Sequence, residues 1–244
     1  MRPRVLQCKG ERMEPTIYKP SIYKGAGIYK TGAEGGGGDE PVIYYDNIGG
    51  KNYPYVKIGS LYWLAENLDY LGDNIPLKTL AQWQKNGNVI QAAYYNDDLD
   101  FAHANKLGLL YDYGAVLQLR NEDLNGWRVP DKNDWDNLIN TCWGEGNAAM
   151  FLKARDGYIS DNFPQDWHGL DKYSFCMLPG GILGEDSSHN PCYSDVGTYS
   201  YTFLYRDNSS WFRTIFSIDA KTNYIHDTIY NGWYGRYMRL CKNA

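Results

Sequence analysis

One stretch in the middle of the chain decides the fold, and it reads GWRVPDKNDWDNLINTC from Gly126 to Cys142. After its glycine and proline turn residues, Asp131 is placed to cap the N-terminus of a helix. Asp134 adds a favourable negative charge in the first turn. Apolar side chains then recur at i, i+3, i+4 and i+7, which is the spacing of one buried helix face. They are Trp135, Leu138, Ile139 and Cys142. The stretch therefore predicts a turn followed by an amphipathic helix.

Upstream of this helix, two short runs with strand character flank a turn. They read YVKIG from Tyr55 to Gly59 and LYWLA from Leu61 to Ala65. We expect a β-hairpin here, closed around Gly59-Ser60. Two weaker helical patterns cover Asp100 to Lys106 and Leu77 to Lys85.

The last third of the chain is rich in strand signals. Aromatic side chains alternate with smaller or polar ones from Tyr199 to Tyr205, which is the period of a half-buried strand. Further β-prone runs are Trp211 to Ile218, Thr222 to Tyr230 and Arg236 to Cys241. Many short strands beside few helices predict an α+β fold with small mixed or antiparallel sheets, about two helices and long loops.

The first forty residues differ in composition from the rest. They contain three copies of Ile-Tyr-Lys, at Ile17–Lys19, Ile22–Lys24 and Ile28–Lys30, followed by four glycines, Gly35–Gly38. Such a segment holds too little apolar mass to fold alone. We predict that residues 1–40 form an extended arm with a hinge and that residues 41–244 form one ligand-binding domain. The arm is either a solvated linker or a segment that docks onto a larger assembly or a sister subunit.

Charge and hydropathy exclude several classes of protein. The formal net charge is −5, the isoelectric point is about 5.4, and the acidic excess falls after residue 40. An acidic body disfavours binding to phosphate backbones, so we expect no nucleic acid partner. No apolar run reaches the roughly 18 residues that span a bilayer, and the N-terminal residues lack the apolar core of a signal peptide. We expect no membrane insertion, and a virion or a cell surface is the candidate location.

Cysteines and histidines show no metal or redox pattern. The five cysteines are widely spaced and none lies in a C-x-x-C pair, so we expect buried or free thiols. A Cys176–Cys192 disulfide is the alternative in an oxidising compartment. The four histidines form no i,i+4 pair, and we predict no metal site and no cofactor.

Five short blocks stand in a fixed order along the chain and resemble the Fibrobacter succinogenes major paralogous domain family over about residues 42–242. An ordered set of five is far more specific than any single block. The blocks are Tyr55–Gly59 with Trp63–Leu68, Tyr95–Asp98 with Lys106–Tyr111, Gly126–Trp135, Leu178–Gly181, and Met238–Lys242.

The resemblance implies a C-type-lectin-like fold, which this family shares with formylglycine-generating enzymes and with the variable proteins of diversity-generating retroelements. In the last block the family places a cysteine directly after the arginine, whereas here Leu240 stands between Arg239 and Cys241. That departure weakens the transfer of a family disulfide to Cys241.

Several residues of these blocks have structural interpretations. Trp63, Trp127 and Trp135 stand beside glycine or proline turns and are expected to pack in the core. Arg128 and Arg239 lie among apolar residues, and we expect each to pair with a buried carboxylate such as Glu66 or Asp112. Gly180-Gly181 follows a proline and is expected to supply turn dihedrals that other residues avoid.

No catalytic constellation stands out, and we predict that the protein is not an enzyme. A formylglycine-generating type of enzyme needs two reactive cysteines near the C-terminus, and only Cys241 lies there. Asp97, Asp98 and Asp100 follow Asn96 in what reads as a solvated acidic turn, with an acid pair or a calcium loop as alternatives. The Glu-Pro-Asn, Gln-Pro-Asp and Trp-Asn-Asp tripeptides of calcium-dependent lectins are absent.

The candidate ligand-binding residues lie near the C-terminus, where aromatic side chains alternate with Ser, Asn and Asp. Such mixtures are typical of adaptable binding surfaces, because aromatics give rigid contact area and small polar groups give hydrogen bonds. An ordinary sheet with aromatics packed on both faces is the alternative. The candidates are Tyr205, Asp207, Asn208, Trp211, Asn223, Tyr224, His226, Asp227, Tyr230, Asn231, Trp233 and Tyr234.

We interpret the chain as a receptor-binding or adhesin-like display domain. We expect it to bind a protein or glycan receptor on a cell surface and to be carried on an assembly such as a phage tail fibre. The resemblance further implies a hypervariable C-terminal surface produced by a diversity-generating retroelement, and a homo-oligomer, specifically a trimer. Two alternatives stay open. One is a hydrolase or oxidase acting at Asp97, Asp98 or His103, and the other is a structural spacer.

Overall fold

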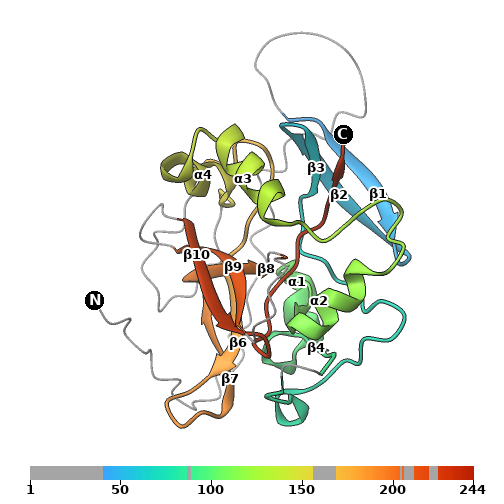
Figure 1. Cartoon of the computed structure of the whole chain (residues 1–244), viewed down its shortest axis with the longest axis vertical. Helices are drawn as coiled ribbons and strands as arrows, with labels where there is room; N and C mark the ends of the chain where they lie inside the picture. The colour runs from blue at the N-terminus through green and yellow to red at the C-terminus, as the bar shows by residue number, and fades with distance from the viewer. Residues whose placement is uncertain (1–40, 87–88, 156–168, 204, 206–211, 220–224) are drawn as a thin grey trace.

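The computed structural model describes residues 41–244 except 87–88, 156–168, 204, 206–211 and 220–224, with the backbone alone for 212–216, 219 and 226–230. Helices lie beside several small antiparallel sheets (Figure 1). The α+β class predicted from the sequence is therefore confirmed.

One four-stranded sheet joins the two ends of the described chain. Its order is β1-β2-β3-β11, and every neighbouring pair is antiparallel. Figure 1 shows the C-terminal strand beside the blue strands of the N-terminal half. The predicted hairpin is confirmed as β2–β3, with Gly59 at φ +64° in its turn. The strands are β1 (Ile43–Ile48), β2 (Lys51–Ile58), β3 (Leu61–Leu64) and β11 (Cys241–Asn243).

A three-stranded sheet with the order β10-β9-β8 is built from consecutive segments of the chain. Beside it lies a two-stranded sheet, β6–β7, and a second pair, β4–β5, is shorter. All of these pairs are antiparallel. The strands are β4 (Ala92–Ala93), β5 (Leu110–Tyr111), β6 (Gly180–Glu185), β7 (Pro191–Val196), β8 (Tyr199–Phe203), β9 (Phe212–Asp219) and β10 (Ile225–Asn231).

Four α-helices accompany the sheets in the described chain. They are α1 (Leu99–Ala104), α2 (Tyr113–Arg120), α3 (Lys132–Thr141) and α4 (Glu145–Leu152). The strongest helix prediction is confirmed by α3, where Asp131 and Asp134 accept hydrogen bonds from each other's backbone N–H groups. The weaker pattern over Asp100 to Lys106 corresponds to α1, while α2 and α4 were not expected.

The helix expected over Leu77 to Lys85 is wrong. Only a 3₁₀ turn forms there, Leu80–Gln82, with reciprocal caps between Thr79 and Gln82. Trp83 then takes an extended conformation and is buried at 5% exposure. Burying this indole outweighs the weak helical propensity of the segment.

The predicted core role of the three tryptophans is confirmed. Trp63 and Trp135 are 0% and 1% exposed, and their ring centroids lie 4.8 Å apart between the four-stranded sheet and α3. Trp127 is 3% exposed and packs on the other face of that sheet, against Tyr55. The sheet is thus covered on both faces, by one core cluster on each.

Arg128 pairs with a buried carboxylate as expected, although with Asp134 instead of the two named candidates, whereas the expectation for Arg239 is wrong. Arg128 forms a two-pronged ion pair with Asp134, with 2.7 Å from Nη2 to Oδ1. Arg239 is fully buried and has no carboxylate partner in the described chain: it donates to Asn67 Oδ1 and to three backbone carbonyls, those of Leu64, Phe175 and Cys176. Burial lowers the pKa of Arg239 to about 10, which still leaves it charged at neutral pH.

The carboxylates proposed as their partners have other roles. Glu66 pairs with Lys106 at 3.1 Å. Asp112 is fully buried and caps α2, where its Oδ1 accepts from the N–H groups of Ala115, at 2.8 Å, and Gln91. Burial raises the pKa of Asp112 to about 7 against these hydrogen bonds.

The expectation that Gly180-Gly181 supplies unusual dihedrals is met at Gly181 alone, and Gly180 is required for a different reason. Gly181 has φ +76°, which disfavours a side chain. Gly180 lies so close to the ring of Tyr237 that a Cβ would come within 2.4 Å of it. The two glycines therefore allow the first residues of β6 to pack directly against the buried ring of Tyr237.

Candidate functional site

The structure separates the predicted binding residues by position in the β8–β10 sheet. Five of them, Asp207, Asn208, Trp211, Asn223 and Tyr224, lie outside the described residues. In the antiparallel register Tyr230 pairs with Arg213, while His226 pairs with Ser217 near the opposite end of β10. The sheet therefore places Tyr205, Tyr230 and Asn231 toward one end, and His226 and Asp227 toward the other.

A polar and aromatic group at the first end gathers around Glu185, the last residue of β6. Lys85 donates to Glu185 at 2.9 Å, and His189 Nδ1 lies 3.3 Å from the same carboxylate oxygen. The Tyr234 hydroxyl also hydrogen-bonds to Glu185. The Lys85 ammonium lies 4.8 Å above the ring centre of Trp233. We call these residues, Lys85, Glu185, His189, Trp233 and Tyr234, the Glu185 cluster.

The charges in the Glu185 cluster stabilise one another. Burial acts to raise the pKa of Glu185, but hydrogen bonds from Lys85, Tyr234 and His189 together lower it, so the carboxylate is ionised. The pKa of Tyr234 is raised to about 12 by burial and by the nearby Glu185, so its phenol stays neutral. The cluster thus offers a fixed carboxylate, a phenol and a 77% exposed imidazole at one surface.

Trp233 does not point outward as expected. It is 7% exposed and belongs to a core cluster, and its backbone carbonyl accepts from the indole of Trp83 at 2.9 Å. Its ring meets that of Tyr234 edge to face at 4.4 Å. Because the loop after β10 tucks this large apolar ring inward, Trp233 supports Tyr234, which stays half-buried.

Tyr205 and Asn231 are also half-buried and lie near the same end of the sheet. The backbone N–H of Tyr205 donates to Pro130 at 3.0 Å, and the guanidinium of Arg120 lies 3.8 Å above its ring. The carbonyl of Asn231 accepts from the N–H of Tyr234 at 3.2 Å. Backbone anchors therefore hold both predicted residues in defined positions.

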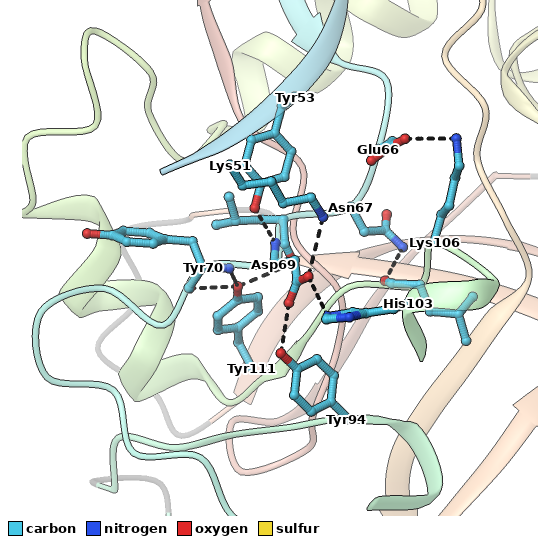
Figure 2. Close-up of polar contacts among 12 residues, drawn as sticks. Lys51, Tyr53, Glu66, Asn67, Asp69, Tyr70, Tyr94, His103, Lys106 and Tyr111 are labelled. Carbon is cyan, nitrogen blue, oxygen red and sulfur yellow. Dashed lines mark hydrogen bonds and ion pairs between the residues drawn. The ribbon is translucent and has the colours of Figure 1, made fainter. Parts of the chain in front are cut away.

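A second polar centre, around Asp69, was not predicted. Figure 2 shows Lys51, Tyr94 and His103 converging on its carboxylate from three separate segments. Nε2 of His103 lies 3.0 Å from Oδ2, the Lys51 ammonium lies 3.3 Å from the same oxygen, and the Tyr94 hydroxyl donates to Oδ1 at 3.1 Å. The side chain of Asp69 is 8% exposed, so its charge is offset by these donors.

Two buried tyrosines fix the backbone around Asp69. The Tyr53 hydroxyl accepts from the N–H of Asp69 at 2.9 Å. The Tyr111 hydroxyl accepts from the N–H of Tyr70 and donates to the carbonyl of the same residue at 2.9 Å. The Asp69 carboxylate, fixed in this way, orients the His103 imidazole as a histidine–aspartate pair does in acid–base catalysis. Residues 51, 69, 94 and 103 share no local pattern, so the sequence carried no signal for this centre.

The acidic residues considered for catalysis or calcium hold loops together. Asp97 accepts from the Leu80 N–H at 2.8 Å and from the Tyr193 hydroxyl at 2.6 Å. Asp98 caps α1 by accepting from Phe101 at 2.8 Å. Throughout the described part of the chain, no group of three or more histidine, cysteine or acidic side chains is arranged to hold a metal ion.

Cys142, Cys176 and Cys241 are free thiols. The Cys176–Cys192 disulfide considered above is therefore not formed. Burial raises the pKa of Cys142 to about 12 and that of Cys176 to about 11, so neither thiol is a ready nucleophile at neutral pH.

Together, the four helices and the small antiparallel sheets of the described chain define a mixed α+β domain. The model of the Fibrobacter succinogenes major domain matches residues 56–233, and the chain belongs to this family. The family resemblance is thereby confirmed, and the match ends before the last of the five blocks, Met238–Lys242. No curated protein and no solved structure matches the chain. Among the described residues, no helix combines the length and apolar character needed to cross a membrane.

Proposed function

We propose that this protein is a non-enzymatic ligand-binding domain whose recognition surface includes the end of the β8–β10 sheet where Tyr205, Asn231 and Tyr234 lie. The observation that carries the proposal is the Glu185 cluster. It presents a carboxylate, a phenol and an imidazole beside the half-buried ring of Tyr234, and these groups are held by one another and by the buried ring of Trp233. Preorganised polar and aromatic side chains of this kind bind partners at a low entropic cost.

The cluster has a rigid support. Gly235 and Leu183 exchange backbone hydrogen bonds at 2.8 and 3.0 Å, which ties the loop after β10 to β6. A Cβ at Gly235 would come within 3.0 Å of the Leu183 side chain, so the contact is close. The polar groups of Glu185 and Tyr234 are thus displayed from a backbone that is fixed on two sides.

Binding is tested with glycan and protein arrays probed with the purified full chain. We expect discrete bound spots, which H189A and N231A weaken while the thermal midpoint stays within a few degrees of wild type. The matched control is W143A, because Trp143 is 70% exposed and follows α3, remote in sequence from the proposed surface. Equal binding by all three variants contradicts the proposed surface. The absence of any bound spot favours the structural spacer.

A hypervariable origin of the C-terminal surface is part of this proposal, as are display on a phage tail fibre or another surface assembly and a C-type-lectin-like fold. The family membership supports them, together with the mixture of Asn, Tyr, Ser and Asp in residues 205–234. The test is genomic. We expect a nearby repeat of the coding segment that differs only at adenines, beside a reverse-transcriptase gene, and a genome that lacks both contradicts the hypervariable origin.

The His103–Asp69 pair favours a hydrolase as the second candidate. His103 is half exposed and its imidazole is held by a carboxylate, which is the orientation a general base needs. The probe is hydrolysis of p-nitrophenyl acetate by the full chain, with H103A and the surface control H189A. Under the binding proposal, wild type and both variants turn over the ester no faster than an equal concentration of imidazole. Turnover that H103A alone removes contradicts a non-enzymatic role.

A further inference from the structure

The two edges of the four-stranded sheet differ in how they are covered. At the β11 edge, Arg128 and Cys241 exchange backbone hydrogen bonds at 2.9 and 3.0 Å, so that edge is occupied. At the other edge, β1 pairs with β2 over six consecutive residue pairs without a bulge. Within the described chain, no strand pairs with β1 on its far side.

The β1 edge lacks the usual protection of an edge strand. Natural edge strands are kept short or carry lysine, proline or a bulge, because exposed backbone groups pair readily with another strand. Here Val42 is 56% exposed and Tyr44 is 39% exposed, and the strand itself, Ile43–Ile48, contains neither lysine nor proline. An exposed, regular and partly aromatic edge is suited to β-strand addition.

The strand β1 begins with the dipeptide that the N-terminal arm repeats. Ile43-Tyr44 has the same order as Ile17-Tyr18, Ile22-Tyr23 and Ile28-Tyr29. In β1 the isoleucine is half-buried against the core cluster that contains Trp63 and Trp135, and Tyr44 stacks on Tyr55 of β2 with ring centres 5.3 Å apart at 22°. One Ile-Tyr unit in this chain is thus seen to add to a sheet, with its tyrosine on a cross-strand tyrosine.

We propose that an Ile-Tyr-Lys unit from the arm of one copy adds as a strand to β1 of a second copy. In this pairing the arm tyrosine stacks on Tyr44 as Tyr44 stacks on Tyr55, and the arm isoleucine lies on the face of Ile43. The repetition of the unit favours a second copy over the same chain. Each chain has one β1 edge that can accept a strand, but three Ile-Tyr-Lys units that can supply one. The two additional units find an acceptor only when further copies of the chain are present.

The pairing also matches the charge distribution. Each unit carries a lysine, whereas residues 41–244 contain more acidic than basic side chains. The inference goes beyond ligand binding, because it concerns how copies assemble and involves none of the Glu185 cluster.

Analytical ultracentrifugation of the full chain tests the proposal over a hundredfold range of concentration. We expect the weight-average mass of the wild type to rise with concentration, and the triple variant I17K/I22K/I28K to need an at least tenfold higher concentration for the same rise. Because these three residues lie in the predicted arm, we expect the variant to leave the fold of residues 41–244 intact. Y44K should have the same effect and Y44F should retain association, since the phenyl ring can still stack. The control is W143K, which changes an exposed aromatic residue after α3.

Three results overturn the proposal. The first is a wild type that stays monomeric throughout the range, and the second is association that the triple variant leaves unchanged. The third is a monomer whose β1 amides are protected from hydrogen exchange in the wild type but not in the triple variant, because the arm then pairs with its own chain. None of these results affects binding on the arrays, so the two proposals fail separately.

Discussion

The four-stranded and three-stranded sheets are assembled from the chain in opposite ways. The first joins residues 43–64 to residues 241–243, so its β3–β11 pairing brings together two segments from opposite ends of the described chain. The second uses three consecutive segments within residues 199–231. The first is covered on both faces by core clusters, and the strands of the second contain four of the twelve predicted binding residues, His226, Asp227, Tyr230 and Asn231. Changes within the first sheet should therefore disturb the whole domain, while changes at the connections of the second should stay local.

The largest expected effect is that of W63A in β3. Trp63 is fully buried against Trp135 and Phe175, so its removal leaves a large cavity and should lower the free energy of unfolding by about 3 to 5 kcal/mol. Urea denaturation measures the change. W143A, at a 70% exposed tryptophan, should change stability by less than about 0.5 kcal/mol. If W63A and W143A lowered the free energy of unfolding by similar amounts, the buried four-stranded sheet would not be more sensitive to substitution than the protein surface.

R239M should have the next largest effect. The methionine keeps part of the apolar stem but leaves Asn67 and the carbonyls of Leu64, Phe175 and Cys176 without their donor. Because unsatisfied buried acceptors are costly, we expect a loss of about 3 kcal/mol by urea denaturation. R120M, which changes an arginine over the Tyr205 ring beside the three-stranded sheet, is the matched control and should lose about 1 kcal/mol or less. A milder loss for R239M than for R120M would reverse the comparison.

Asp112 gives a pH dependence that belongs to the scaffold. Burial raises its folded-state pKa to about 7, well above the ordinary value of an aspartate, so the folded protein holds a proton that the unfolded chain releases. This contribution to stability is fully present below about pH 4 and is lost as the pH rises through about 7. Between pH 5 and pH 8 we expect it to fall by about 2.5 kcal/mol.

The control for this pH dependence is D112N, whose amide oxygen can still accept the hydrogen bonds that cap α2. Thermal midpoints measured from pH 5 to pH 8 should decline more steeply for the wild type than for D112N. Parallel curves for the two proteins would show that Asp112 is ionised in the fold.

The smallest expected effect on stability is at the proposed recognition surface, at the end of β10 and in the β6–β7 turn. N231A and H189A change half-buried or exposed side chains and should shift the free energy of unfolding by less than about 0.5 kcal/mol. Circular dichroism melting curves check this. A loss above about 2 kcal/mol for either variant would show that this surface is part of the core and would remove the contrast between the sheets.

Elements with a strong local signal could be predicted from the sequence. The hairpin β2–β3 and helix α3 were predicted because a turn glycine and a capping aspartate mark their ends. Helix α4 was missed because its sequence, EGNAAMFL, is apolar along most of its length and shows no 3.6-residue period, and Gly144 at its N-cap supplies no side-chain cap. The division of the chain at residue 40 stays a prediction.

Sites that depend on distant segments could not be predicted. The sequence indicated aromatic residues near the C-terminus, but it held no information that Lys85 and Glu185, one hundred positions apart, meet beside Tyr234. The same holds for Asp69, whose partners come from three other segments. The outward direction of Trp233 was wrong because an alternating pattern does not describe a loop that turns inward at the end of a strand.

The pairing of β3 with β11 sets an order of events during synthesis. Leu61–Leu64 leaves the ribosome early, yet it gains its second neighbouring strand only when Cys241–Asn243 has followed. The three-stranded sheet is made of nearby segments and can form while this partner is still missing. A nascent chain stalled before residue 241 should therefore expose the unfinished β3 edge to chaperones, even when the segment that carries the recognition surface has already been made.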